Sequence, residues 1–405
     1  MEQSVRKVDI KGVCFLAAFN ILAFQMYLAS NVSTVFNYAD EAVFLAIIFF
    51  ACRYHWLSKG GKGVGTVLLL LAALLLDGLI GNLINPYPQL ASSVVVDVFT
   101  CVKFFILAIA LMGCADGPRL PGGSLPIIFD EAKILCLLMA TTSVVSLFFN
   151  IGMSSGEVRY GLRGYRFVFE HPEIVNLLCV GLSIVFCADL KRNLSWLLLM
   201  QVPVLLTLRS KSFAFVAILG VIVLSVKNKT VARKMFIPTI VLVVAIACLS
   251  IHHYYADQAQ ARTRLMMGAV QIAGDSFPFG LGFGSYGSAV TATASGYPEV
   301  YDALGFSAVY GLSRVYPAFV SDTFWPIILG QFGWLGLAIV CLLVIALLVK
   351  LLDIIRSTAS EGYAVGAVLL IAYLAISSMA GSAIFAPMSI YLLLCLHINY
   401  CHQNA

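Results

Sequence analysis

TFWPIILGQFGWLGLAIVCLLVIALLV, the stretch formed by residues 323–349, contains no charged side chain from one end to the other. A helix that crosses the hydrocarbon core of a bilayer needs about 20 predominantly apolar residues, whereas a membrane-spanning β-strand needs only about 9–11. This stretch has the helical length. The sequence therefore predicts a transmembrane helix here.

The rest of the chain has the same apolar character. Its residues are 61% hydrophobic and only 11% charged, with a mean hydropathy of +0.95, whereas soluble domains contain about 25% charged residues. Twelve apolar stretches are predicted to span the membrane: residues 12–31, 38–54, 63–83, 93–113, 131–151, 172–190, 194–208, 212–226, 235–251, 323–349, 362–380 and 383–400. The predicted fold class is all-α, a polytopic integral membrane protein of about 12 transmembrane helices, in which residues 1–405 form a single membrane domain.

Basic residues outside these stretches indicate the orientation, because short cytoplasmic loops collect Lys and Arg. Such residues lie at alternate connections: Arg6, Lys7 and Lys11, then Arg53, Lys59 and Lys62, then Arg119, then Lys191 and Arg192, then Lys227, Lys229, Arg233 and Lys234, and finally Lys350 and Arg356. Both termini are therefore predicted to be cytoplasmic. The net charge of +5 reflects this topology and implies no nucleic-acid partner.

Two segments on the opposite, external side interrupt the apolar pattern. Residues 152–171 form a short Arg-rich loop, and residues 252–321 form a long loop before the tenth predicted span. A long loop in a compact protein is usually functional. Within it, apolar residues recur at helical spacing over residues 259–273, which predicts an amphipathic helix on the membrane surface.

The sequence predicts no disulfide, metal or cofactor. The eleven cysteines lie almost entirely within predicted spans and form no C-x-x-C pair, and a buried cysteine in a helix usually fills space as a small apolar residue. Residues 282–287 match G-x-G-x-x-G, but no βαβ unit surrounds them, as a dinucleotide site would require. A close-packed turn is the better interpretation, because glycine lets the backbone approach a ligand or another helix.

Eight basic residues are predicted on the external side, where the positive-inside rule does not explain them: Arg159, Arg163, Arg166, Arg209, Lys211, Arg262, Arg264 and Arg314. Arginine forms paired hydrogen bonds with phosphate and does not lose its charge. A phosphorylated, membrane-embedded substrate handled on the outer face would account for these residues. The alternative is a rim of side chains whose charged ends reach the lipid headgroups.

Local spacing refines these candidates. Arg159, Arg163 and Arg166 would share one face if their segment were helical, and His171 follows them. Arg262 and Arg264 are two positions apart, so on a helix they diverge and only one is expected to face a site.

Arg209 and Lys211 lie in a basic turn between two short apolar stretches. If those stretches form a broken pair of helices, both residues lie near helix ends, where backbone N–H groups favour anions. The alternative is an ordinary external turn.

Asp322 precedes the tenth predicted span, where it is either an N-cap or a general base. Neighbouring arginines are expected to keep its carboxylate ionised.

At these residues the chain resembles the O-antigen polymerase and ligase superfamily, bacterial polysaccharide enzymes of the GT-C class. The resemblance consists of scattered motifs between Arg159 and Gly336. They include the basic turn LTLRSKSF, a PxGxGxGxF-like turn over residues 277–286, and Asp322 followed by Thr323, nine residues and a GxxG pair. The ligases carry histidine where this chain has Asp322, so the chain looks like a Wzy-type polymerase.

The resemblance implies inverting, metal-independent glycosyl transfer at the periplasmic face of the bacterial inner membrane. The donor would be a growing glycan on undecaprenyl pyrophosphate, and the acceptor would be the next lipid-linked repeat unit. The lipid bilayer is a further partner, and a chain-length regulator is another that the resemblance allows. It implies catalytic roles for Asp322 and Arg264. It implies pyrophosphate or glycan binding by Arg209, Lys211, Arg262, Arg314, Arg159, Arg163, Arg166 and His171.

Among these, Arg209, Arg264 and Arg314 are the external arginines closest to the mouths of predicted spans, and they are expected to contact the pyrophosphate. Two other functions remain open. One is an O-antigen ligase that moves finished polymer to a lipid acceptor. The other is a transporter of lipid-linked oligosaccharides or anions, which is less favoured because the arginines gather at one face and no internal repeat is visible.

Overall fold

The computed structural model describes residues 10–53, 62–87, 89–112, 124–227, 245, 260–293, 296–358 and 360–403, and most of these are helical. Seven helices are long and apolar enough to cross a membrane, or eight if the bent pair α1–α2 counts as one span. The described chain thus has the helix composition of a multi-pass membrane protein. These candidates are fewer than the twelve predicted spans, and predicted span 235–251 lies outside the described residues except for residue 245.

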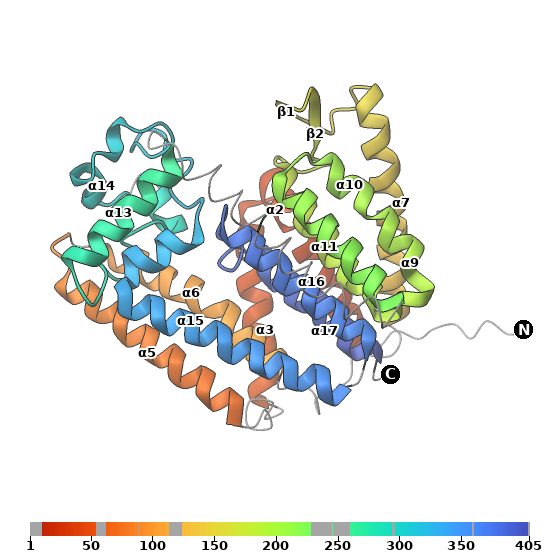
Figure 1. The fold of residues 1–405 in the computed structure, drawn as a ribbon, viewed down its shortest axis with the longest axis horizontal. Helices are drawn as coiled ribbons and strands as arrows, with labels where there is room; N and C mark the ends of the chain where they lie inside the picture. Colours follow the sequence, from red (N-terminus) through yellow and green to blue (C-terminus); the bar gives the residue numbers. More distant parts are fainter. Residues whose placement is uncertain are drawn as a thin grey trace, which may run out of the picture.

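The elements follow in chain order (Figure 1): α1 (Ile10–Ala23), α2 (Gln25–Asn31), η1 (Thr34–Tyr38), α3 (Ala39–Arg53), α5 (Lys62–Ile84), α6 (Ala91–Met112), α7 (Ser124–Phe148), β1 (Ser154–Arg159), β2 (Leu162–Tyr165), α8 (Pro172–Phe186), η3 (Cys187–Asp189), α9 (Leu190–Leu199), α10 (Gln201–Leu206), α11 (Ser210–Lys227), α13 (Ala261–Asp275), η4 (Ala289–Ala292), α14 (Glu299–Ala303), η5 (Phe306–Ala308), α15 (Phe324–Thr358), α16 (Glu361–Ser378) and α17 (Met388–Gln403).

Helices α8 to α11 fold back along one another, with α9 and α10 following in the same direction. A straight helix over residues 172–206 would hold its ends about 50 Å apart. Instead, Nη2 of Arg209 lies 3.0 Å from Nε2 of His171, so the chain must turn back between them. It does so at η3, where the Asp189 side chain accepts a hydrogen bond from the Arg192 amide and caps α9. The turn between α10 and α11 therefore returns to the start of α8.

The Arg-rich loop is a β-hairpin rather than a helix. Strands β1 and β2 pair antiparallel, with Arg159 opposite Leu162. The two residues of the turn, Tyr160 and Gly161, have φ values of 53° and 78°. Positive φ at both positions is typical of the tight turns that join adjacent strands. Arg159, Arg163 and Arg166 therefore do not share a helical face, which corrects the helical alternative considered for them.

The glycine-rich turn packs against helices α5 and α15. The Asn82 side chain on α5 forms two hydrogen bonds of 2.9 Å with the backbone of Phe283. Gly282 has φ +83°, and a Cβ there would lie 2.3 Å from the Asn82 backbone nitrogen. Only glycine permits this approach. The turn also lies against α15, which is broken at Gly333 with φ 61° and ψ −158°.

Helix α13 forms close to the predicted position, but its apolar face packs against protein. Leu265 and Ile272 are buried among the tyrosines that follow α13, whereas Val270 is exposed. The Tyr286 hydroxyl donates a 2.6 Å hydrogen bond to the carbonyl of Leu265. Leu265 and Ile272 thus pack against α15 and the tyrosines rather than facing outward.

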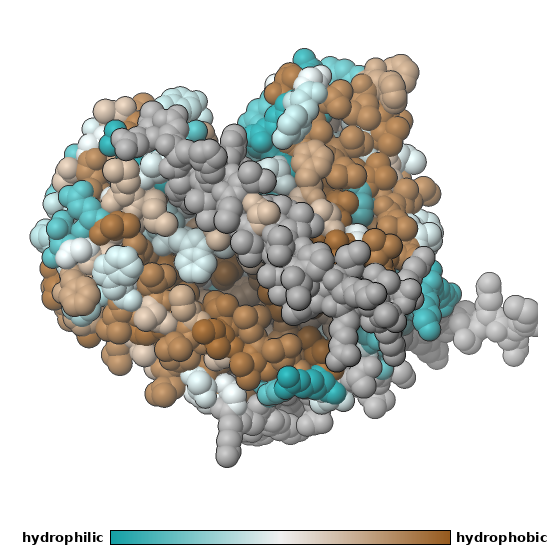
Figure 2. Space-filling view, viewed as in Figure 1, coloured by the Kyte–Doolittle hydropathy of each residue, from teal (hydrophilic) through white to brown (hydrophobic). Residues whose placement is uncertain are grey.

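The described elements form two lobes at one end of the molecule (Figure 1): α13 and α14 lie in one, and the β1–β2 hairpin, α10 and the end of α7 lie in the other. Figure 2 shows a notch between these lobes, with hydrophilic residues on the hairpin side and mostly apolar residues below. Such an apolar zone is what a bilayer requires of the surface that faces it. The candidate site lies where these two lobes meet.

Candidate functional site

A cavity of about 260 Å³ lies where residues of both lobes meet. Its walls come from the hairpin, the starts of α8, α11 and α13, the segment before α15 and the connection between α16 and α17. The lining residues are Arg159, His171, Glu173, Leu177, Arg209, Ser210, Lys211, Arg262, Ser321, Asp322, Ala380, Gly381, Ser382, Ala383 and Ala386. The lining contains four basic side chains, Arg159, Arg209, Lys211 and Arg262, and two carboxylates.

Several helices begin at this cavity. Pro172 and Ser210 are the first residues of α8 and α11, and Ala261 is the first residue of α13. The first N–H groups of a helix have no partner within the helix, and its dipole places partial positive charge at this end. Three such ends therefore add to the positive side chains, and the arrangement favours an anionic ligand.

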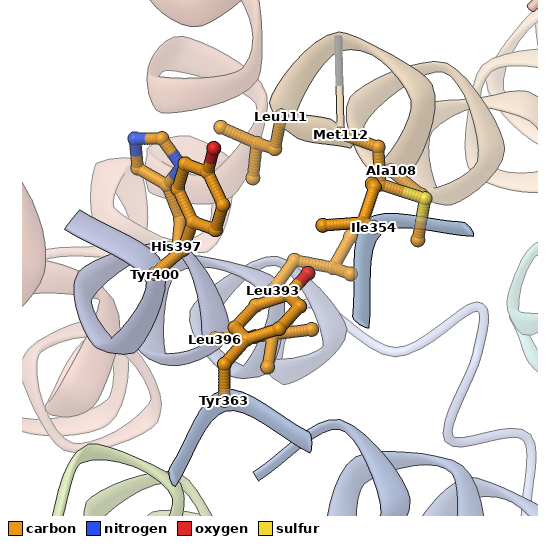
Figure 3. Close-up of a pocket in the computed structure, with 9 residues that line it drawn as sticks. All are labelled: Ala108, Leu111, Met112, Ile354, Tyr363, Leu393, Leu396, His397 and Tyr400. Atoms are coloured by element: carbon orange, nitrogen blue, oxygen red, sulfur yellow. The ribbon is translucent and has the colours of Figure 1, made fainter. Parts of the chain in front are cut away.

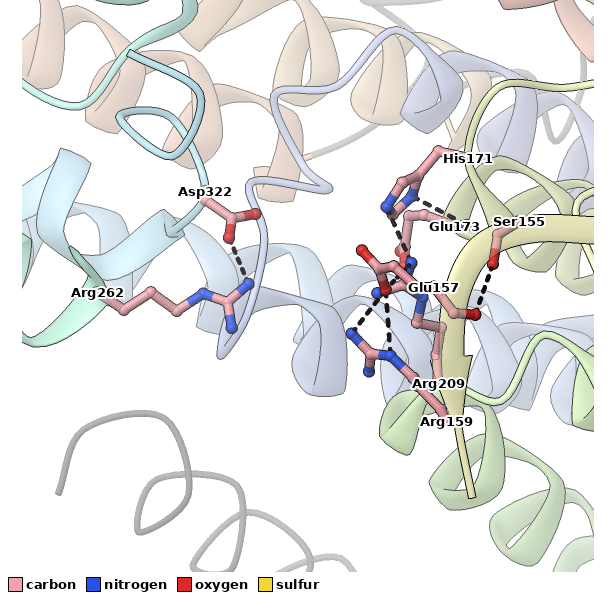
Figure 4. Close-up of polar contacts among 8 residues, drawn as sticks. All are labelled: Ser155, Glu157, Arg159, His171, Glu173, Arg209, Arg262 and Asp322. Carbon is pink, nitrogen blue, oxygen red and sulfur yellow. Dashed lines mark hydrogen bonds and ion pairs between the residues drawn. The ribbon is translucent and has the colours of Figure 1, made fainter. Parts of the chain in front are cut away.

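Carboxylates pair with the cations on the hairpin side (Figure 4). Oε2 of Glu157 lies 3.2 Å from Nη2 of Arg159 and 3.3 Å from Nη2 of Arg209. Lys211 forms an ion pair with Glu173. The Tyr373 hydroxyl, on α16, donates a 3.2 Å hydrogen bond to the same carboxylate. Each cation on this side is thus held in position by a neighbouring acid.

A separate ion pair lies across the cavity, where Arg262 on α13 contacts the Asp322 carboxylate (Figure 4). The Asp322 segment is tied to the α16–α17 connection, because the Ser382 hydroxyl donates a 3.1 Å hydrogen bond to the Ser321 carbonyl. The two sides therefore present cations toward one space, with one carboxylate, Asp322, on the side opposite the hairpin.

Burial shifts the ionisation of two groups at this site. It raises the pKa of the Asp322 carboxyl, and the attraction of Arg262 opposes that rise without cancelling it. The expectation that nearby arginines hold this pKa low is therefore corrected: desolvation outweighs the opposite charge. Burial and the charge of Arg209 lower the pKa of the His171 imidazole, so this ring is neutral at pH 7. A carboxylate whose pKa lies closer to neutral pH is a stronger general base.

Six of the ten predicted site residues line the cavity: Arg159, His171, Arg209, Lys211, Arg262 and Asp322. Sequence spacing placed them at helix ends or in external loops, and the fold brings these ends together. Of Arg262 and Arg264, it is Arg262 that faces the cavity.

The other four predicted residues lie elsewhere. Arg163 and Arg264 are exposed, and Arg166 donates a 3.2 Å hydrogen bond to the Gly152 carbonyl. Arg314 pairs with Asp302 at 3.2 Å, within the lobe of α13 and α14. Arg264 and Arg314, which the sequence predicts as pyrophosphate contacts, thus lie outside the cavity lining, whereas Arg262 is part of it. Arg262 and Arg264 differ in this respect because, two positions apart on α13, they project from different faces of the helix.

The predicted set lacks three residues that shape the site, Glu157, Glu173 and Ser382. Glu173 follows His171 and Pro172 at the start of α8, so its position at a helix end was a usable signal. Ser382 lies in a run of small residues between two predicted spans. Small residues at a short connection leave space, but the sequence does not show that this connection lies against the Asp322 segment.

A second pocket lies within the bundle, between α6, α15, α16 and α17 (Figure 3). Its lining is mostly apolar and includes His397 and Tyr400. The volume is about 20 Å³, which is room for about one water molecule. This pocket is too small for a substrate.

Within the described part of the chain, no group of three or more His, Cys, Asp or Glu side chains could hold a metal ion. The arrangement at the larger cavity instead offers guanidinium groups, an ammonium group and helix ends for anion binding, with a carboxylate that can accept a proton. No protein-family model matches the chain, and no curated protein is significantly similar to it in sequence.

Proposed function

We propose that this protein is a membrane glycosyltransferase that polymerises oligosaccharide repeat units carried on undecaprenyl pyrophosphate. It would act at the periplasmic face of the bacterial inner membrane. The observation that carries this proposal is the cavity itself, in which Arg209, Lys211 and Arg262 line the same space as the Asp322 carboxylate. This combination suits a reaction in which a hydroxyl group loses a proton while a diphosphate leaves.

The chemistry follows from these groups. An acceptor hydroxyl attacks the anomeric carbon of the donor sugar, and the bond from that carbon to the diphosphate oxygen breaks with inversion. Asp322 takes the hydroxyl proton as general base. The electron pair of the broken bond remains on the diphosphate, whose growing negative charge is stabilised by Arg209, Lys211 and Arg262. Fixed cations supply this stabilisation without having to reorganise during the step.

The position of the cavity supports a lipid-linked substrate. It lies at the ends of apolar helices, where α8 and α11 begin and α16 ends. A carrier lipid can remain beside such helices while its diphosphate enters the cavity. Pockets that enclose a whole drug-sized ligand measure about 300–1,000 Å³, so a cavity of about 260 Å³ encloses the reacting groups and leaves the glycan outside.

Deletion of the gene tests the proposed function. We expect the deletion strain to carry single repeat units on its surface acceptor lipid and to lack the polymer, with restoration by the wild-type gene. The measurement is the ladder of surface glycans on a gel. Polymer that accumulates intact on the carrier lipid would indicate the ligase instead, and an unchanged ladder would contradict both functions.

The rate is expected to rise with pH through the raised pKa of Asp322 and then to level off, because only the ionised carboxylate can accept the proton. Replacing Arg262 with glutamine removes the attraction that opposes the effect of burial, so the acid limb should move to higher pH. The measurement is the pH–rate profile of purified protein with lipid-linked repeat units. Arg264→Gln is the matched control, since Arg264 is exposed, and its profile should match the wild type.

A further inference from the structure

A group of aromatic side chains is exposed on the lobe that carries Arg262 and Asp322. Tyr310 is 75% exposed, Tyr316 48% and Phe319 37%. The ring centroid of Tyr310 lies 5.2 Å from that of Tyr316 and 6.0 Å from that of Phe319. These three residues are called the aromatic platform below. Contiguous exposed apolar groups of this kind commonly mark an interaction site.

The backbone of the loop fixes the aromatic platform. The Tyr316 amide donates a 3.0 Å hydrogen bond to the Ser313 carbonyl, and the Phe319 amide donates a 2.8 Å hydrogen bond to the Gly311 carbonyl. Gly311 has φ +83°, and a Cβ there would lie 2.0 Å from the Phe319 ring. Glycine at this position therefore lets the Phe319 ring pack directly on the chain. The arrangement is ordered locally although the rings are exposed.

Polar groups lie near the rings in the chain, since Arg314 precedes Tyr316 by two residues. Arg314 forms its ion pair with Asp302, and its guanidinium carbon lies 4.8 Å from the centre of the Tyr297 ring. A sugar ring presents C–H groups on its face and hydroxyls around its edge. Aromatic faces bordered by hydrogen-bonding groups match both surfaces, as in binding sites where apolar contacts dominate and a few polar groups fix orientation. An acyl chain would match only the rings.

The aromatic platform is continuous with the cavity. The Asp322 amide donates a 3.2 Å hydrogen bond to the Phe319 carbonyl, so the last residue of the platform is joined to the candidate base by one turn of chain. Val320, between them, is fully buried and anchors this turn in the lobe. A ligand that reacts at Asp322 and extends outward along this lobe would reach the rings.

We infer that the aromatic platform binds sugar rings of the glycan beyond the unit that reacts at the cavity. This inference rests on the proposed function and adds a second binding surface to it. By holding the chain between additions, the platform sets how long a polymer grows before it is released. The cavity alone would support each addition but would not retain the product.

Tyr310→Ala tests this inference through polymer length, because the ring is mostly exposed and its loss leaves the core unchanged. We expect repeat units to be added at close to the wild-type rate, while the most abundant chain length falls at least about twofold. Loss of one stacking ring corresponds to about fivefold weaker glycan binding. Tyr310→Phe keeps the ring and should restore full length. The matched control is Tyr38→Ala on η1, where the ring is 69% exposed but distant in sequence from the platform.

Purified protein in nanodiscs gives the second measurement. Tyr310→Trp introduces a fluorophore at the platform. Its emission is obtained as the difference between the spectra of the variant and of the unsubstituted protein. Glycan released from lipid-linked repeat units should change this emission, whereas brominated phospholipids should not quench it. Quenching by brominated lipid would place the rings in the bilayer and overturn the inference. Unchanged chain length in Tyr310→Ala, in a strain that makes polymer, would also overturn the inference. Absence of polymerase activity in the wild type would instead contradict the proposed function itself.

Discussion

Asp322→Asn is expected to reduce polymer formation by about 10²–10⁴-fold, the range typical of a lost general acid or base. Asparagine keeps the size of the side chain and its ability to accept a hydrogen bond, but it cannot take the proton of the acceptor hydroxyl. It also leaves Arg262 without the carboxylate that contacts it. The measurement is incorporation of lipid-linked repeat units by purified protein, together with the amount of the variant in the membrane.

Asp302→Asn is the matched control for this change. Asp302 lies in the same lobe and also pairs with an arginine, Arg314, but it does not line the cavity. Its replacement should leave the rate close to that of the wild type. Near wild-type activity in Asp322→Asn would contradict the role of general base. Glu173, the other carboxylate in the lining, would then be the candidate for that role.

Arg262→Gln is expected to reduce the rate by about 10²–10³-fold, the cost of removing one preorganised group that stabilises charge in a transition state. The guanidinium contacts Asp322 in the structure, and it is the arginine on that side of the cavity best placed to reach a leaving diphosphate. Arg262→Lys should recover only part of the loss, because a compact ammonium cannot form the paired hydrogen bonds of a guanidinium. Repeat-unit incorporation by purified protein gives the rates.

Arg264→Gln supplies the comparison, since it removes the same charge from the same helix two residues away. We expect it to have little effect on the rate, because Arg264 is exposed and lies outside the cavity lining. Equal losses in Arg262→Gln and Arg264→Gln would show that both act only through the general positive charge of the lobe. That result would remove the specific role given to Arg262.

The membrane helices could be predicted because their signal is local. Helices α5, α6 and α16 begin and end within two residues of predicted spans 63–83, 93–113 and 362–380. Length and apolar content are enough for this, since an apolar run of about 20 residues has few other stable arrangements. The hairpin over residues 154–165 was not predicted, because its turn depends on the backbone conformation of Tyr160 and Gly161.

The candidate site was predictable in part for the same reason. Arg209 and Lys211 lie in a turn between apolar stretches, and Asp322 precedes another, so all three were expected at helix ends. The choice between Arg262 and Arg264 depends on how α13 rotates against α15, and the buried Leu265 and Ile272, spaced three and ten positions after Arg262, lie on the same face as Arg262. The contribution of Ser382 depends on a contact with Ser321, 61 positions away in the chain.

The acids beside the cations have a consequence for competition with ordinary salts. Glu157, Glu173 and Asp322 already occupy the positions that anions would take at Arg209, Lys211 and Arg262. A chloride ion would have to displace a carboxylate of equal charge, so the exchange would gain little. A diphosphate concentrates several charges in one group and can replace several carboxylates at once. The three acids therefore compete with free anions for the cations. We expect the cavity to bind small monovalent anions weakly and a diphosphate more strongly.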